Sequence, residues 1–341
     1  MRLEDFDYDL PPDLIAQIPI VHRDASKLLV LDRRTRALEH RFFQDLPTYL
    51  KNGDLLVMND TRVLPARLLG RRARTGGKVE VLLLREVSPG QWETLVKPGR
   101  RCLLGEELIF GQGQLRAEII NRTPEGGRVV AFDSQGSEFF NLLGKLGQMP
   151  LPPYIHAKLS DPERYQTVYA RHPGSAAAPT AGLHFTPQLL AQIRSLGVET
   201  AFITLNVGLG TFRPVREENI KEHHMHEEYY AISSETAQSI NKAKSEGRRV
   251  IAVGTTVVRT LEAAGSRGQV EFGESCTDLF IYPGFQFKIV DALITNFHLP
   301  KSSLLMLVAA LAGYDNIMAA YKEAVAKRYR FFSFGDAMLI I

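Results

Sequence analysis

The chain has 341 residues, of which 45% are apolar and 23% are charged, and its net charge is +3. These values are ordinary for a soluble globular protein, and the length suits two domains better than one core. No apolar run reaches 18 residues and the N-terminus is acidic, so we expect neither a membrane span nor a signal peptide. With only Cys102 and Cys276, neither a disulfide framework nor a cysteine-based zinc site is expected, and a reducing cytoplasm fits best.

The first predicted elements are a hairpin over residues 27–43, a short helix, and a buried strand over 53–58. The strand runs directly into four polar residues, Asn59, Asp60, Thr61 and Arg62. Ligands collect at strand ends in α/β proteins, so these side chains are candidates to hold a ribose, an amino acid or a phosphate. The alternative is a domain-crossing turn that is held by an Asp–Arg pair.

The composition changes after residue 67, where short β-type runs alternate with Gly, Pro and Asn turns. The runs are 78–84, 91–96, 107–110, 115–120 and 128–132. Strands at this spacing predict a small antiparallel barrel or sandwich, and a helix over 137–146 follows. Because α/β patterning then resumes, the predicted fold class is α/β: a large α/β domain with an inserted small antiparallel β-barrel domain. The predicted boundaries are 1–62 and 154–341 for the large domain and 63–153 for the insertion.

Positive charge is concentrated in the predicted barrel. The segment 62–101 holds ten Lys and Arg residues against three acidic ones, a net charge of +7. A smaller cluster, Lys327, Arg328 and Arg330, lies near the C-terminus. Clustered positive charge is typical of a polyanion-binding surface, and the alternative is a solvated basic face.

A stretch of small residues, Gly and Pro runs from Tyr165 to Thr186 and brings His184 to the start of a helix. Small side chains let the backbone approach a ligand closely, and a histidine can exchange a proton near neutral pH. Thr186 and Pro187 predict the N-cap and first turn of a helix that Gly197 ends. That helix start would favour the neutral, basic form of His184. The alternative is a Pro-rich surface loop.

Strands and helices alternate after residue 199, which predicts a largely parallel sheet with ligands at its C-terminal strand ends. The expected elements are strands over 199–206, 229–232 and 248–253, a helix capped by Ser233 or Ser234 and ended by Gly247, a helix over 257–264, and a buried helix within 303–313. The turn 208–214 is not a dinucleotide fingerprint. The turn 254–256 lacks the P-loop lysine, but a helix start there can bind an anion, and capping alone explains it equally well.

Two further histidine segments are candidates for chemistry. The segment 223–228 contains three histidines and two glutamates, but Tyr230 occupies the position at which His-Glu-x-x-His needs its second histidine. A proton-transfer pair is therefore favoured over a zinc site. His298 follows Asn296 and precedes the buried helix, where it serves either catalysis or structure.

Taken together, these residues resemble the S-adenosylmethionine:tRNA ribosyltransferase-isomerases of queuosine biosynthesis. The segments that carry the resemblance are 15–19, 23–26, 53–67, 96–100, 165–186, 204–215, 223–228, 254–262, 278–284, 295–305 and 329–339. They cover nearly the whole chain, and their number and order make the match specific. Lys27 stands where arginine is common in the family, which keeps the charge but loses the bidentate fork.

The resemblance implies that S-adenosylmethionine, as a substrate, donates its ribosyl group to 7-aminomethyl-7-deazaguanine at the wobble position of a tRNA. The product is then epoxyqueuosine-tRNA, with release of adenine and methionine, and no metal or other cofactor is implied. The expected catalytic residues are His184, His226, Glu228 and His298. The expected substrate-binding residues are Arg23, Asn59, Asp60, Arg62, Thr180, Gly182, Arg259 and Asn296. The expected tRNA-binding residues are Arg71, Arg72, Arg74, Lys97 and Arg100. A monomer without membrane contact is favoured.

Within this chemistry, His184 is the first candidate for the base that removes the sulfonium-acidified ribose proton. On that expectation, His184→Gln lowers turnover roughly a hundredfold. His226 with Glu228 is the next candidate for the base. Two other classes stay open on the residues alone. One is a non-catalytic RNA-binding protein that uses the basic β unit, and the other is a metal-dependent hydrolase built on the segment 223–228.

Overall fold

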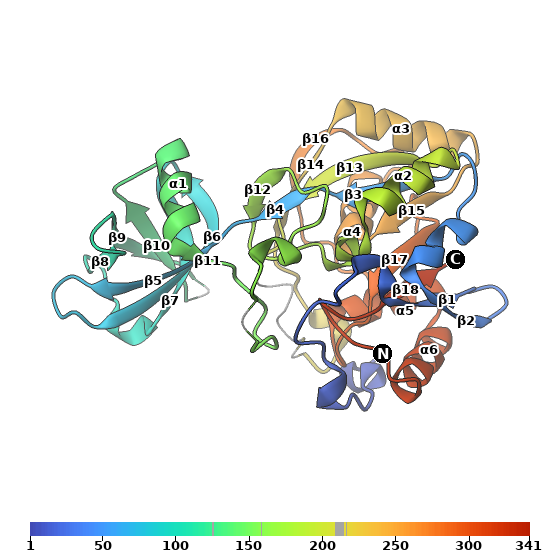
Figure 1. Cartoon of the computed structure of the whole chain (residues 1–341), viewed down its shortest axis with the longest axis horizontal. Helices are drawn as coiled ribbons and strands as arrows, with labels where there is room; N and C mark the ends of the chain where they lie inside the picture. Colours follow the sequence, from blue (N-terminus) through green and yellow to red (C-terminus); the bar gives the residue numbers. More distant parts are fainter. Residues whose placement is uncertain (125, 158, 209–214, 216) are drawn as a thin grey trace. The chain divides into compact units, whose positions relative to one another are not determined.

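The computed structural model describes the chain except for residues 125, 158, 209–214 and 216. The chain forms two compact units (Figure 1). The large unit consists of Met1–Thr61, Pro153–His172 and Ala178–Ile341, and the small unit of Arg62–Pro152 and Pro173–Ala177. Two short strands, β4 (Thr61–Val63) and β12 (His172–Ser175), lie where the chain passes between the units.

The large unit is built on a mixed sheet of nine strands within the described residues. In spatial order they are β16 (Gly273–Thr277), β14 (Glu228–Ile232), β13 (Glu199–Leu205), β3 (Leu55–Asn59), β15 (Val250–Val253), β17 (Ala292–Asn296), β18 (Ala337–Ile340), β1 (Lys27–Leu31) and β2 (Leu38–Phe42). The central strands β13, β3, β15 and β17 are parallel to one another. Antiparallel pairs lie on both sides of this centre, although β18 and β1 again pair in parallel, so the expectation of a largely parallel sheet holds only in part.

Helices cover both faces of this sheet. One face packs on η4 (Phe43–Tyr49), η7 (Thr180–His184) and α2 (Pro187–Ser195). α3 (Ser234–Ser245) and α4 (Thr255–Ala264) pack on β3, β13 and β15, while α5 (Ser303–Ala312) packs on α4 and α6 (Tyr314–Ala326). The other 3-10 helices of the described residues are η1 (Leu3–Phe6), η2 (Pro12–Leu14), η3 (Arg23–Ala25), η5 (Gly99–Arg101), η6 (Pro162–Tyr165) and η9 (Ile220–Glu222).

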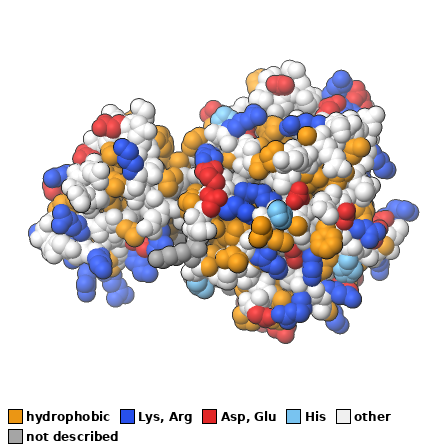
Figure 2. Space-filling model, viewed as in Figure 1, with side chains coloured by type: hydrophobic (Ala, Val, Ile, Leu, Met, Phe, Trp, Pro, Cys, Tyr) orange, Lys and Arg blue, Asp and Glu red, His pale blue; other side chains and the backbone are white. Residues whose placement is uncertain are grey.

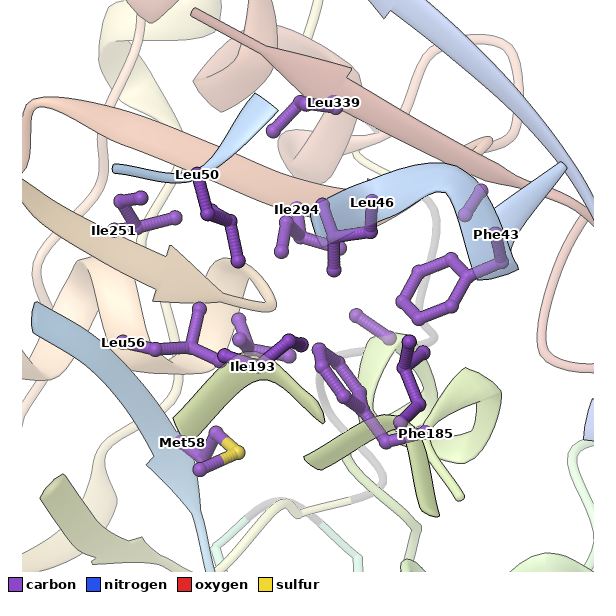
Figure 3. Close-up of a cluster of buried hydrophobic side chains, with 14 of the residues drawn as sticks. Phe43, Leu46, Leu50, Leu56, Met58, Phe185, Ile193, Ile251, Ile294 and Leu339 are labelled. Atoms are coloured by element: carbon purple, nitrogen blue, oxygen red, sulfur yellow. The ribbon is translucent and has the colours of Figure 1, made fainter. Parts of the chain in front are cut away.

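The core under η4, η7 and α2 is apolar and tightly packed (Figure 3). Phe43 and Phe185 meet edge to face with ring centroids 5.0 Å apart, and both side chains are fully buried. Ile193 of α2 and Ile294 of β17 belong to the same cluster. Burial of this much apolar surface holds η7, and with it His184, against the sheet.

The small unit is a closed antiparallel barrel. Its strands, in order, are β5 (Arg67–Arg72), β6 (Lys78–Ser88), β7 (Gln91–Lys97), β10 (Arg128–Phe132), β9 (Leu115–Arg122) and β8 (Glu107–Phe110), and β8 pairs back with β5. A two-residue strand, β11 (Gly147–Gln148), extends the sheet beside β5. α1 (Gly136–Leu146) inserts Phe139 among the core aromatics, 5.6 Å from Trp92 and 4.9 Å from Phe132 between ring centroids.

These observations confirm the predicted fold class, an α/β domain with an inserted antiparallel barrel. The predicted helix caps are also present: Thr186 and Ser233 accept hydrogen bonds from the backbone of the first turns of α2 and α3. Strand β5 was not among the predicted runs, because its arginines and Gly70 mask the alternation. α4 begins at Thr255, two residues earlier than predicted.

No single helix of the described residues is long and apolar enough to cross a bilayer. α5 and α6 reach that length and composition only together, and they are bent by 116° at the break between them.

Candidate active site

A pocket opens in the large unit at the carboxyl ends of the central strands. Val207 follows β13, the turn 254–256 follows β15, and the segment 295–300 ends and follows β17. Residues 178–181, with Tyr154, Phe332 and Ser333, complete the wall. The cavity has a volume of about 130 Å³, and its wall combines apolar side chains with a few polar groups, as is typical of small-molecule sites. The sequence predicted ligands at this edge of the sheet.

The N-terminus of α4 lines the pocket through Thr255 and Thr256. The preceding Gly254 has φ of 94°, a backbone conformation that strains residues with a side chain. No side chain of the described residues caps this helix, so its first N–H groups and the positive end of its dipole are available to an anionic group. The sequence left two interpretations of 254–256 open, an anion site and a helix cap alone, and an anion site stays a prediction.

His298 is the only histidine among the described residues that lines this pocket. Its Nε2 lies 2.9 Å from Thr295 Oγ1. Its backbone is fixed on both sides, because its N–H donates to Tyr321 Oη at 3.0 Å and its carbonyl accepts from Tyr8 Oη. Burial lowers the pKa of His298 to about 3, so the ring is neutral at physiological pH.

His184 is buried next to the pocket and has partners on both ring nitrogens. Nδ1 lies 2.7 Å from Ser26 Oγ, and Nε2 lies 3.1 Å from Asn296 Nδ2. The ring of Phe43 stacks on the imidazole at 5.0 Å between centroids. Asn296 itself lines the pocket, so the structure brings the predicted residues His184, Asn296, His298 and Thr180 into one region.

The pKa of His184 is lowered to about 3, in the expected direction, but the expected cause was wrong. Burial is the largest cause, and the charges of Arg23 and Arg330 add to it. The ring sits at the C-terminal end of η7, and α2 begins only at Pro187. The dipole of α2 was therefore not needed to keep this histidine neutral. A role as the base remains a prediction.

An aromatic wall at the pocket was missed by the sequence analysis. The rings of Tyr154 and Phe332 lie 4.4 Å apart between centroids, and Tyr154 Oη bonds to Ser333 Oγ at 2.6 Å. Phe332 has φ of 72°, which is rare for a residue with a side chain and marks a constrained backbone. Only an aromatic residue in a Pro-rich turn at 154 and the Phe-Phe-Ser run at 331–333 hinted at this surface.

Asn59 and Asp60 support this region without lining the pocket. Asn59 is fully buried, and its side chain bonds to the backbone of Leu205 and reaches Thr256 Oγ1 at 3.5 Å. Asp60 accepts from Thr204 Oγ1 at 2.7 Å and lies 3.6 Å from His172. Burial raises the pKa of Asp60. Arg62 belongs to the small unit.

The structure pairs Glu228 with Arg259. Both side chains are 3% exposed, and the Arg259 guanidinium also donates to the carbonyls of Leu279 and Thr277. Glu228 Oε1 accepts from the backbone of Gly208. His226, its predicted proton-transfer partner, is exposed. Among the described residues, no three His, Cys, Asp or Glu side chains gather as metal ligands.

Two other predicted substrate-binding residues make internal contacts. Arg23 is half-buried and donates to the carbonyls of Leu183 and Glu163. Gly182 packs so closely under Tyr169 that a Cβ at this position would lie 2.1 Å from the tyrosine hydroxyl. Most of the predicted turn at 208–214 lies outside the described residues.

The predicted tRNA-binding residues lie on the barrel. Arg71, Arg74, Lys97 and Arg100 are exposed, while Arg72 is half-buried and donates to the carbonyl of Arg101 at 3.2 Å. In Figure 2, Lys and Arg side chains are spread over the visible face of the barrel and gather at its lower edge. Such a surface offers charge to a polyanion without burying it.

The fold and the pocket define an α/β protein with a pocket at the carboxyl edge of its sheet and a basic barrel inserted in the chain. The model of the family described as "Queuosine biosynthesis protein" matches residues 3–340. The chain therefore belongs to the queuosine biosynthesis protein family, as the sequence resemblance indicated.

Curated relatives and a solved structure agree with this assignment. S-adenosylmethionine:tRNA ribosyltransferase-isomerases of Symbiobacterium thermophilum and Moorella thermoacetica are 62% and 60% identical, each over 342 aligned residues and 100% of both chains. The crystal structure of S-adenosylmethionine tRNA ribosyltransferase from Thermotoga maritima is 42% identical, with a TM-score of 0.58. That match covers 99% of this chain and 100% of the other.

Proposed function

We propose that this chain is an S-adenosylmethionine:tRNA ribosyltransferase-isomerase. It transfers and isomerises the ribosyl group of S-adenosylmethionine onto 7-aminomethyl-7-deazaguanine at the tRNA wobble position. The products are epoxyqueuosine-tRNA, adenine and methionine. The observation that carries the proposal is the 62% identity to a relative of that name over the whole of both chains.

The reaction needs a group that accepts the proton from the ribose carbon beside the sulfonium. His298 is our candidate, because it lines the pocket and is neutral, so its ring has an unprotonated nitrogen. If Nε2–H donates to Thr295 Oγ1, Nδ1 is the nitrogen left to accept.

The two ends of S-adenosylmethionine fit two walls of the pocket. Its carboxylate suits the uncapped start of α4 at Thr255 and Thr256. Arg23 and Arg259, two of the expected substrate-binding residues, already donate to other groups of the protein. Its adenine suits the aromatic surface of Tyr154 and Phe332.

The barrel supplies the tRNA-docking surface in this proposal. Its exposed arginines and lysines attract phosphates at long range, and the substrate of the reaction is a polyanion. We also propose that the two units are the functional domains, that the protein works as a monomer in the cytoplasm, and that the reaction needs no metal.

The deciding experiment is incubation with S-adenosylmethionine and tRNA that carries the aminomethyl-deazaguanine, followed by mass spectrometry of the digested nucleosides. Epoxyqueuosine should appear together with equimolar adenine and methionine. His298→Asn should lower turnover roughly a hundredfold, the usual cost of losing a general base, while S-adenosylmethionine affinity changes little. A non-catalytic RNA-binding protein would bind the tRNA and leave every nucleoside unchanged.

Chelation tests the absence of a metal requirement. Activity should survive prolonged dialysis against a chelator. Loss of activity that one divalent ion restores would instead support a metal-dependent enzyme. The His223→Ala variant is the control, because the metal-site hypothesis was built on the segment 223–228. If no metal is needed, this variant should keep its activity.

A further inference from the structure

A buried chain of hydrogen bonds joins Ser26, His184 and Asn296. Asn296 Nδ2 lies 3.2 Å from the carbonyl oxygen of Phe332 and 3.5 Å from that of Asp336. Carbonyl oxygens only accept hydrogen bonds, so this atom is the amide nitrogen and the carboxamide cannot be flipped. The same nitrogen lies 3.1 Å from His184 Nε2, which must therefore be the acceptor.

The remaining bonds follow from that assignment. A neutral imidazole has one donor and one acceptor nitrogen, so Nδ1–H of His184 donates to Ser26 Oγ at 2.7 Å. Ser26 Oγ in turn donates to the carbonyl of Arg23 at 3.3 Å, and this is the last bond of the network. A protonated ring would turn a second N–H toward the amide nitrogen of Asn296. The network therefore suits only the neutral ring with its proton on Nδ1.

The other edge of the Asn296 carboxamide is unsatisfied. Asn296 is 3% exposed and lines the pocket, yet its Oδ1 is buried and has no hydrogen-bond partner among the described residues. A buried acceptor without a partner is destabilising, and the carboxamide cannot flip to satisfy it, because its two N–H groups donate to His184 Nε2 and to the carbonyl of Phe332. A donor that arrives with a ligand would satisfy it.

We propose that His184 is a positioning residue that locks the Asn296 carboxamide, so that Oδ1 accepts a hydrogen bond from a nitrogen donor of S-adenosylmethionine. The inference rests on the proposed function and gives His184 a different role from the base that the sequence suggested. S-adenosylmethionine has two nitrogen donors, the adenine amino group and the methionine ammonium. Either group could donate an N–H to Asn296 Oδ1.

Substitution of His184 separates positioning from proton transfer. Glutamine offers one acceptor and one donor, as the neutral imidazole does, but it cannot act as a base at neutral pH. His184→Gln should keep turnover and S-adenosylmethionine affinity within about threefold, and its pH–rate profile should match the wild type. His184→Ala should bind S-adenosylmethionine about tenfold more weakly, since the carboxamide is no longer held. A hundredfold fall in turnover for His184→Gln at unchanged affinity would overturn the inference.

Calorimetry on Asn296→Ala identifies the donor. The variant should bind S-adenosylmethionine about tenfold more weakly. The penalty should vanish for S-inosylmethionine if the adenine amino group is the donor, or for the analogue without the methionine amino group if the ammonium is. An equal penalty for all three ligands, or none for any, would contradict the proposal. Asn241→Ala is the matched control, since its carboxamide bonds only to the backbone of Val270, away from the pocket.

A spectroscopic test does not depend on turnover. In protein labelled with nitrogen-15 histidine, His184 should show the Nδ1–H tautomer and should not titrate between pH 5 and 9. A His184 signal that titrates in this range would overturn the inference. If the wild-type chain binds S-adenosylmethionine but transfers no ribosyl group, only the proposed function is wrong. If the Asn296→Ala enzyme is active and binds S-adenosylmethionine as tightly as the wild type, only this inference is wrong.

Discussion

The barrel and the large unit differ in where their charged side chains lie: several of those on the barrel are exposed, whereas an ion pair of the large unit is buried. On the barrel, Arg85 pairs with Glu93 while its side chain stays 71% exposed, and Arg71 and Arg74 are also exposed. In the large unit, the Glu228–Arg259 pair is 3% exposed on both sides. Exposed charge attracts a distant polyanion and is screened by salt, whereas buried charge fixes neighbouring groups and is costly to disturb. The two regions should therefore respond to different perturbations.

The largest effect is expected from breaking the buried pair. Arg259→Ala leaves Glu228 buried without its cation and should lower the free energy of unfolding by about 3–5 kcal/mol. Arg85→Ala on the barrel should change it by at most about 1 kcal/mol. Urea unfolding followed by circular dichroism measures both. Replacing Glu228 and Arg259 together by leucine should recover much of the loss, and equal losses for the single and double variants would show that the ion pair is not the cause.

Acid should act on the large unit first. Burial lowers the pKa of His184 and of His298 to about 3, below the value near 6.5 of an unfolded histidine. At these two positions the unfolded chain therefore binds more protons between pH 6.5 and 3, and their contribution to stability falls as pH falls through that window. Each histidine contributes up to about 1.4 kcal/mol per pH unit. In the His184→Gln variant, the slope of the free energy of unfolding against pH should be smaller by the contribution of one proton.

The barrel provides the internal control for acid. It contains no histidine, and Trp92, the single tryptophan of the chain, is buried in its core. Trp92 fluorescence should therefore report little change between pH 6.5 and 4, while circular dichroism reports loss of the large unit. Coincident transitions would mean that the barrel unfolds together with the large unit.

Salt should act on the barrel. Replacing Arg71, Arg72 and Arg74 together by alanine should weaken tRNA binding about ten- to a hundredfold near physiological salt and flatten its salt dependence, because fewer counterions are released. Affinity for S-adenosylmethionine should stay unchanged. Wild-type tRNA affinity and an unaltered slope would place the docking surface elsewhere, with the cluster of Lys327, Arg328 and Arg330 as the next candidate.

The smallest effects are expected from a pair of glycines. Gly182→Ala forces a methyl group into the Tyr169 hydroxyl and should destabilise the large unit by about 1–3 kcal/mol. Gly144→Ala in α1 of the barrel meets nothing within 4 Å and should stabilise the chain by up to about 1 kcal/mol. Thermal unfolding of the two variants gives both values, and shifts in the same direction would contradict the packing argument.

The sequence by itself determined the elements whose signals are local. Thr186 and Ser233 predicted helix starts correctly because a side-chain cap acts within its own turn. The runs of the barrel and the strand-helix alternation predicted the fold class, since period and turn chemistry are read along the chain. The edge that carries the pocket also followed, because β13, β15 and β17 belong to the parallel centre of the sheet and their carboxyl ends lie at that edge.

Only the tertiary structure decided which side chains meet. Glu228 lies two residues from His226 in the sequence but pairs with Arg259, 31 residues away. The partners of His184 are Ser26 and Asn296, which are 158 and 112 residues distant. Hydrogen bonds of this kind depend on how the strands are ordered in the sheet, and the spacing of residues along the chain carries no record of that order. The protonation state of a buried histidine is set by such partners and by the loss of water around it, so its chemical role could be assigned only after folding had placed them.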